Sequence, residues 1–157
     1  MQKSNEQSEV IIRRAELDDA AVLQLLYRQL QPKDPILEKA EFSQHLQQLI
    51  GQDGLEVFVL ESAGKIASTC YLNIIPNLTR AAKPYAVIEN VVTDEDARGQ
   101  GFGKRLIRHA IEQAWAAGCY KVMLMTGSKE AATHAFYQAC GFVGDEKHAY
   151  ILRRPQK

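Results

Sequence analysis

The segment from 84 to 117 constrains the fold of this 157-residue chain more than any other part. It begins with a run rich in β-branched residues (PYAVIENVVT, 84–93) and ends with apolar residues at steps of three and four (101–117). The first pattern predicts a strand, and the second predicts an amphipathic helix packed on a sheet. The glycine-rich run RGQGFG (98–103) lies between them, so the chain is expected to turn sharply from strand to helix there.

The rest of the chain predicts an α+β fold in one domain over residues 1–157. Strand patterns occur at 10–14, 55–60, 65–75, 121–126 and 150–153, and helix patterns follow Asp18 and Asp19 and occupy 37–50 and 129–140. This order predicts a three-layer α/β/α arrangement, in which helices cover both faces of a mixed, mostly antiparallel central sheet. Residues 1–9 are expected to form a flexible leader.

The composition of the chain indicates which partners it is expected to bind and in which cell compartment it is expected to work. Lys plus Arg and Asp plus Glu number 19 each, so no net field is expected to attract nucleic acid or an anionic membrane. The polar N-terminus lacks the apolar core of an export signal, and no apolar run approaches the length of about 18 residues that spans a bilayer. Cys70, Cys119 and Cys140 are too widely spaced to suggest a zinc site or a disulfide framework. These observations predict a cytoplasmic protein without a metal.

The loop from Arg98 to Lys104 has the residues of an anion-binding site. A helix N-terminus presents N–H groups that lack intrahelical partners, and glycines allow an anion to approach the backbone closely. Arg98 adds a planar fork of donors suited to phosphate, and Lys104 adds a mobile charge in the first helical turn. A flexible strand-to-helix turn without a ligand is the plainer alternative.

The spacing of the glycines in this loop shows which of the known nucleotide-binding motifs it matches. A P-loop requires four residues between its first glycine and a Gly-Lys pair followed by Ser or Thr, whereas Gly99 and Gly103 enclose three residues and Arg105 follows Lys104. A dinucleotide fingerprint is a weak match, because the glycines fall at alternate positions far from an N-terminal βαβ unit. The remaining pattern begins with Arg or Gln. Two positions of any type follow it, then a Gly, one position of any type, and a final Gly or Ala.

This last pattern, filled by Arg98, Gly101 and Gly103, resembles the pyrophosphate-binding motif of the GNAT acetyltransferases. The run FYQACGF (136–142) is similar to the second signature of that family, and the resemblance covers residues 85–142 most strongly. It implies a GNAT-like fold and an N-acetyltransferase that uses acetyl-CoA as cosubstrate. The reaction implied is direct attack by the primary amine of a small molecule, with both substrates bound.

The resemblance also implies which residues bind and react. Val91 and Val92 lie where the family's strand bulges and directs backbone N–H groups at the acetyl group and pantetheine. Tyr137 is implied as the general acid, because a phenol with a pKa of about 10 stays protonated at neutral pH and can donate to the leaving thiolate. The predicted acetyl-CoA-binding residues are Val91, Val92, Thr93, Arg98, Gly99, Gln100, Gly101, Phe102, Gly103, Lys104, Ser128 and Tyr137.

Three groups are candidates for the general base. Glu89 is the first, alone or through a water, because a carboxylate in an otherwise apolar strand is costly unless it is paired or faces a cleft. A structural ion pair or a substrate-binding role are the alternatives for Glu89. His134 is the second candidate, since it lies three residues before Tyr137 on the same helix face. Cys140 is a weak candidate for an acyl-accepting nucleophile, because no His or Asp is spaced to activate it.

The acceptor remains open among several classes. A small-molecule amine is the first expectation, and the amine of a protein N-terminus or lysine is the alternative, as is a non-catalytic acyl-CoA-binding regulatory module of the same fold. The run ENVV (89–92), followed by CYKVML (119–124), is similar to the glucosamine-6-phosphate N-acetyltransferases. The proline-containing connection QPKDP (31–35) is a place where the substrate side of an enzyme often lies. A homodimer formed through the C-terminal strand is also possible.

Overall fold

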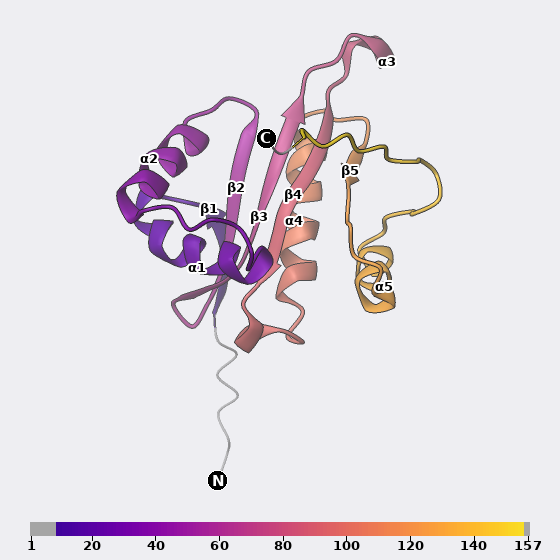
Figure 1. Ribbon diagram of the computed structural model, residues 1–157. Coiled ribbons are helices and arrows are strands. Elements are labelled where there is room, and N and C mark those ends of the chain that lie inside the picture. The colour runs from indigo at the N-terminus through magenta and orange to yellow at the C-terminus, as the bar shows by residue number, and fades with distance from the viewer. Residues whose placement is uncertain (1–8, 156–157) are drawn as a thin grey trace. The chain divides into compact units, whose positions relative to one another are not determined.

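The computed structural model describes residues 9–155, so residues 1–8 of the predicted leader lie outside the described part. The chain forms two compact units, the first ending at Leu124 and the second beginning at Met125 (Figure 1). The first unit contains the sheet and most of the helices.

The sheet of the first unit is mixed and mostly antiparallel, as the sequence predicts. Its strands are β1 (Val10–Arg14), β2 (Leu55–Ser62), β3 (Lys65–Ile75), β4 (Tyr85–Thr93) and β5 (Val122–Leu124), and they lie side by side in chain order. The first three neighbouring pairs are antiparallel, whereas β4 and β5 run parallel. The strand predicted at 121–126 is present as β5, but it is only three residues long.

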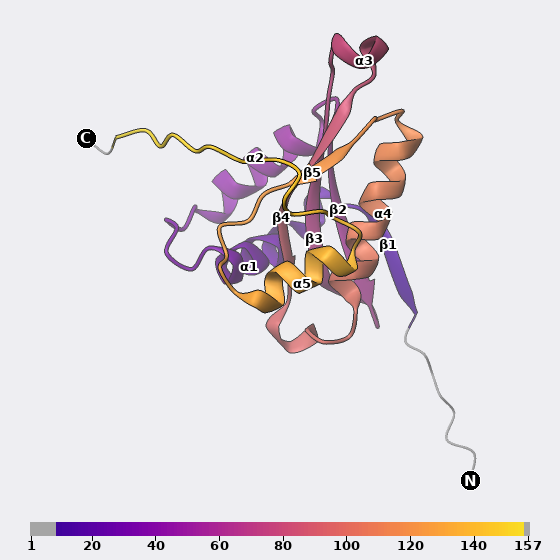
Figure 2. The ribbon, with the colours of Figure 1, turned by 90° about the vertical axis from the view of Figure 1, so that its right-hand side faces the viewer.

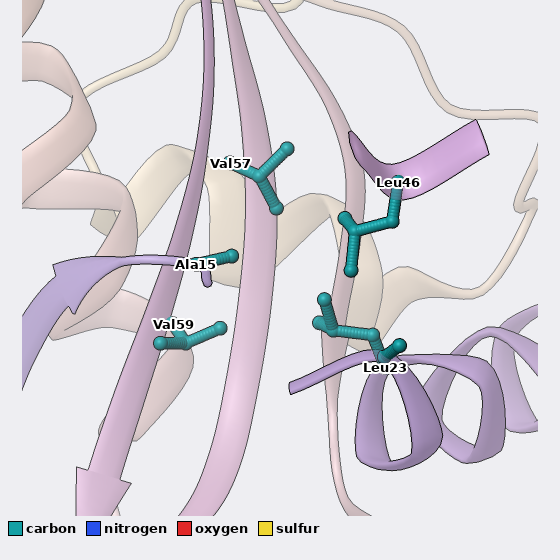
Figure 3. Close-up of a cluster of buried hydrophobic side chains, with 6 residues drawn as sticks. Ala15, Leu23, Leu46, Val57 and Val59 are labelled. Atoms are coloured by element: carbon teal, nitrogen blue, oxygen red, sulfur yellow. The ribbon is translucent and has the colours of Figure 1, made fainter. Parts of the chain in front are cut away.

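Two helices, α1 (Ala20–Leu30) and α2 (Lys39–Ile50), cover one face of this sheet. Leu23 of α1 and Leu46 of α2 are buried in one apolar cluster with Val57 of β2 (Figure 3). The stripe of apolar residues on each helix accounts for this packing, because residues three and four apart lie on the same helix face. A short 3-10 turn, Leu17–Asp19, leads into α1.

The opposite face is covered by α4 (Phe102–Ala116). Phe58, the residue after Val57 in β2, meets the ring of His109 in α4 edge-on, with ring centroids 4.9 Å apart. Successive strand residues point to opposite faces, so Phe58 and Val57 mark the two sides of the sheet. Leu106 is fully buried in this second layer. The three-layer arrangement is thus confirmed within the first unit.

The connection between β3 and β4 contains α3 (Thr79–Ala82), which lies beyond one end of the two strands (Figure 2). Arg80, Ala81 and Ala82 have φ values of 57°, 57° and 58°, in the left-handed region that non-glycine residues seldom adopt. At the other end of β4, the 3-10 turn Glu95–Ala97 leads toward α4.

The second unit contains α5 (Ala131–Ala139), and its described residues, 125–155, include no strand. The prediction of a sheet-closing strand at Tyr150–Arg153 is therefore wrong. The apolar pattern is present, but a strand also requires a hydrogen-bonded neighbour. Tyr150, Ile151 and Leu152 are instead 95%, 76% and 99% exposed.

Candidate active site

A β-bulge interrupts β4 at Asn90 and Val91. Tyr71 of β3 lies opposite Glu89, and Thr69 lies opposite Val92, so two residues of β4 face the single residue Cys70. Asn90 has a φ of 51°, in the left-handed region that Asn tolerates better than most residues. The bulge expected at Val91 and Val92 is present one residue earlier, and Val92 is already paired again.

The ladder between β4 and β5 ends where the bulge begins. Only Ala86, Val87 and Ile88 pair with β5, opposite Val122, Met123 and Leu124. From Glu89 to Thr93, β4 has no ladder with β5. Backbone N–H and C=O groups on this edge need other hydrogen-bond partners, and a bound ligand is able to supply them.

The loop after β4 adopts a conformation that depends on two glycines. Gly99 and Gly101 both have a φ of 78°, and a Cβ atom at either position would meet no heavy atom within 4 Å. The backbone angle, not close packing, therefore explains why glycine suits these positions. Gly101 immediately precedes α4 and provides no side-chain cap, so the first N–H groups of the helix remain available to an anion.

Hydrogen bonds hold this loop to β4 and to α1. Arg98 Nε donates to the carbonyl oxygen of Thr93 (3.3 Å), and the N–H of Asp96 donates to Asp94 Oδ1 (2.9 Å). The N–H of Glu95 donates to Gln29 Oε1 in α1 (3.0 Å). Arg98 is exposed to solvent while this contact directs its side chain back along the loop. A guanidinium in this position is suited to contact a phosphate bound at the α4 N-terminus.

Some residues of the loop are buried and fix its position, whereas others are exposed and are able to contact a ligand. Phe102 and Gly103 are buried, which fixes the first turn of α4 against the sheet. Gln100 is exposed and Lys104 is half-buried. The segment thus combines a fixed helix N-terminus with accessible polar groups, an arrangement that is able to bind an anion.

Glu89 lies half-buried on the face of the sheet covered by α1. Its cross-strand neighbour Tyr71 meets Tyr27 of α1 edge-on, with centroids 5.9 Å apart, and residues directly opposite in a ladder share a face. Among residues 9–155, no cationic side chain lies within 4 Å of the Glu89 carboxylate. The structure therefore gives no support to the structural ion pair considered for this residue.

A cavity of about 190 Å³ lies beside the bulge. Its walls come from α1, the connection after α1, Phe42 of α2, and Asn90. Gln24 Nε2 in α1 donates to the carbonyl oxygen of Leu37 (2.7 Å), which ties the connection to the helix. Tyr27 also lines this cavity, and burial raises the pKa of its hydroxyl well above the ordinary value. Within the described chain that hydroxyl has no hydrogen-bond partner.

Sequence reasoning pointed to the 31–35 connection but did not identify the cavity residues Tyr27 and Arg28. Their positions in α1 read as parts of an ordinary amphipathic helix, and only tertiary packing brings them beside Asn90. It also did not single out Cys70, which lies opposite the bulge. Burial raises the pKa of the Cys70 thiol to about 12, so this thiol is protonated at neutral pH and is no nucleophile.

The second unit holds the remaining predicted site residues. Ser128 Oγ accepts from the N–H of Glu130 (3.2 Å) and lies 3.1 Å from Thr133 Oγ1 at the start of α5. His134 Nε2 lies 2.9 Å from the carbonyl oxygen of Ser128. A carbonyl only accepts, so Nε2 carries the proton and a neutral His134 has Nδ1 as its basic atom.

Tyr137 is half-buried in α5 between two aromatic neighbours. Its ring meets Phe136 and Phe142 at centroid distances of 5.2 and 6.4 Å. Cys140, at the end of α5, is also half-buried. The structure thus places Glu89 and the loop in the first unit, and Ser128, His134 and Tyr137 in the second.

No helix in residues 9–155 is both long enough and apolar enough to cross a bilayer. No group of three or more His, Cys, Asp or Glu side chains gathers in that range in a way that could hold a metal ion.

Comparisons with known proteins identify the family of this chain. Residues 20–142 match the family model described as the acetyltransferase (GNAT) family. Glucosamine 6-phosphate N-acetyltransferase 1 of Oryza sativa subsp. japonica is 36% identical over 122 residues, which cover 75% of this chain and 71% of the rice protein.

Solved structures show the same fold. A candidate acetyltransferase from Agrobacterium tumefaciens strain C58 is 48% identical, with a TM-score of 0.88, and the match covers 92% of this chain and 99% of that one. Glucosamine-6-phosphate N-acetyltransferase from Arabidopsis thaliana is 26% identical, with a TM-score of 0.78 and coverage of 92% and 98%. The chain therefore belongs to the acetyltransferase (GNAT) family and is an acyltransferase.

Proposed function

We propose that this protein transfers the acetyl group of acetyl-CoA to the primary amine of a small molecule, by direct attack with both substrates bound. The observation that carries the proposal is the continuity of residues 89–104. In that one segment, the β5 ladder ends, β4 bulges, and the chain turns through two left-handed glycines into an uncapped helix N-terminus. The GNAT family uses acetyl-CoA, and each of these features suits one part of that molecule.

The first N–H groups of α4 bind the pyrophosphate in this proposal, together with Arg98, Gln100 and Lys104. The helix dipole favours a negative charge at this end, and the left-handed glycines direct the loop around it. Phe102 and Gly103 contribute as buried supports of the first helical turn. The neutral net charge of the chain is no obstacle, because the binding groups are local.

The edge of β4 positions the acetyl group and the pantetheine arm. Backbone groups of Val91, Val92 and Thr93 hydrogen-bond to these parts where no β5 ladder competes for them. An N–H directed at the acetyl carbonyl oxygen stabilises the negative charge that develops there during attack. Ser128 lines the other side of the pantetheine arm in this proposal.

Proton transfer falls to Glu89 and Tyr137. Glu89, directly or through one water, takes the proton from the attacking amine, because it is the half-buried carboxylate next to the bulge and has no cation beside it. Tyr137 gives a proton to the departing thiolate. Glu89 belongs to the first unit and Tyr137 to the second.

The cavity beside Asn90 is proposed as the acceptor site. A volume of about 190 Å³ is smaller than the ~300–1,000 Å³ typical of ligand pockets, so it suits a compact amine. The relatives from Oryza sativa and Arabidopsis thaliana act on glucosamine 6-phosphate by name, so an amino sugar phosphate is the first acceptor to try.

A homodimer is proposed through the exposed segment Tyr150–Leu152. Its three large apolar side chains are almost fully exposed, and pairing with an edge strand of a second copy would bury them. Sedimentation of Ile151→Asp tests this, with Arg153→Gln as a control that changes the net charge by the same one unit. A wild-type protein that sediments as a monomer contradicts it.

A screen of small amines with acetyl-CoA, followed by release of free thiol, tests the proposed reaction. We expect amine-dependent thiol release by the wild-type protein. Loss of this release in Arg98→Ala, with the fold intact by circular dichroism, would support the assignment of the loop. No amine-dependent release from any small amine, together with acetylation of peptides, would favour a protein acceptor.

A further inference from the structure

The cavity beside Asn90 contains one positive and one negative side chain. Arg28 of α1 and Asp34 of the following connection both line it, and most of the remaining wall is apolar or amide. No ion pair joins Arg28 or Asp34 to each other or to any other side chain in residues 9–155. The cavity therefore offers a ligand two opposite charges that the described protein does not neutralise.

Arg28 has a structural role that must be separated from ligand binding. It lies in the last turn of α1, where a cation interacts favourably with the helix dipole. A Lys would serve the dipole equally well, and neither role requires a cavity wall. A guanidinium differs because its fork of donors binds the two oxygens of a phosphate or carboxylate together.

The charges are arranged for a ligand that carries both signs. Asn90 lines the cavity and directly follows Glu89 in β4, although Glu89 itself is not part of the cavity wall. Asp34 adds a second carboxylate that attracts an ammonium group. The positive charge of Arg28 has the opposite effect, because it repels polycations and attracts an oxyanion.

The size of the cavity limits the rest of the ligand. About 190 Å³ corresponds to roughly six water molecules at about 30 Å³ each, so the part of a ligand that the cavity takes up is small. We infer that the acceptor is a compact amine that also carries an oxyanion group, phosphate or carboxylate, and that Arg28 binds this group. This inference rests on the proposed acetyl transfer and names the acceptor class and the residue that selects it.

Matched pairs of amines test the inference through kcat/KM, measured by thiol release. The phosphate pairs are glucosamine 6-phosphate with glucosamine, and phosphoethanolamine with ethanolamine. The carboxylate pair is γ-aminobutyrate with butylamine. We expect the wild-type enzyme to prefer the anionic member of at least one pair by roughly 10-fold or more, and the pair that shows it identifies the oxyanion.

Arg28→Gln should reduce that preference by about 10- to 100-fold, because it removes a charge-assisted hydrogen bond. The kcat/KM of the anionic amine should fall more than that of its uncharged partner, and the KM of acetyl-CoA should stay within about 2-fold of wild type. Arg28→Lys should restore part of the preference. Lys33 lies in the connection after α1 but does not line the cavity. Lys33→Gln therefore removes one positive charge near the cavity and should leave the preference unchanged.

The outcomes separate the inference from the proposed function. A wild-type enzyme that acetylates the uncharged amines as well as their anionic partners overturns the inference and leaves acetyl transfer standing. An unchanged preference in Arg28→Gln, or an equal fall in Lys33→Gln, also overturns the role of Arg28. Failure to acetylate any of the six amines contradicts both the inference and the proposed small-molecule reaction.

Discussion

Replacing Gly101 by Ala should abolish acetyl-CoA binding at a small expense in stability. Gly101 has a φ of 78°, and a left-handed backbone costs an L-residue roughly 1–2 kcal/mol. A Cβ there would meet no atom within 4 Å, so no steric clash adds to this strain. Lower entropy of the unfolded chain offsets about 0.4–1 kcal/mol, which leaves a net loss of about 1 kcal/mol.

Gly118 provides a matched control at the other end of α4. It has the same φ of 78° and the same open space around a hypothetical Cβ. Each Ala variant should therefore lower Tm by about 2–4 °C in a chain of this size. Only Gly101→Ala should also lose the binding site, because relief of its strain turns the first N–H groups of α4 away from the anion.

Differential scanning fluorimetry with and without acetyl-CoA measures both effects. Ligand binding to the native state raises Tm by mass action, so wild type and Gly118→Ala should show the same increase on adding acetyl-CoA. Gly101→Ala should show little or none. An increase in Gly101→Ala equal to that in Gly118→Ala would refute the assignment of this loop to the pyrophosphate.

Four further results follow from the structure. Glu89→Gln should lower kcat most at pH values where the amine is protonated, and an unchanged pH–rate profile would move the base elsewhere, with His134 next. Tyr137→Phe keeps the aromatic packing and should lower kcat by roughly 100-fold with acetyl-CoA affinity retained; near wild-type turnover would make this residue structural. Leu106→Ala should destabilise the fold by about 2–5 kcal/mol in urea titrations, because Leu106 is fully buried, and a loss below about 1 kcal/mol would contradict that packing. Hydrogen bonding to Arg13 lowers the pKa of Asp19. The ionised Asp19 carboxylate therefore stabilises the fold above the unfolded pKa of about 3.9, and this stabilisation is lost as pH falls through the folded pKa. Asp19→Asn should make the free energy of unfolding fall less steeply in acid, and an unchanged fall would exclude Asp19 as its source.

The strand, loop and helix between 84 and 117 were predictable because local patterns determine them. A change from β-branched runs to a three-and-four repeat marks the passage from strand to helix, and glycine permits the left-handed angles found at Gly99 and Gly101. The bulge left a weaker signal. Asn90 is a polar residue of the type that tolerates a left-handed angle, set within an apolar strand.

Two features depended on contacts that no local pattern contains. Residues 150–153 have the composition of a strand, but whether they form one depends on a neighbouring chain segment that their own sequence does not specify. The cavity beside Asn90 lies between α1 and the connection after it, which the Gln24–Leu37 hydrogen bond joins. Arg28 and Asp34 are far from Asn90 in sequence, so their common lining of one cavity required the folded structure.

Initial velocities of thiol release, with acetyl-CoA and an amine acceptor both varied, test the central claim most directly. Direct attack with both substrates bound predicts amine-dependent release and double-reciprocal lines that intersect. Parallel lines, the pattern of a ping-pong reaction through an acetylated enzyme nucleophile such as Cys140, would contradict the account. Thiol release that does not depend on any amine would contradict it as well.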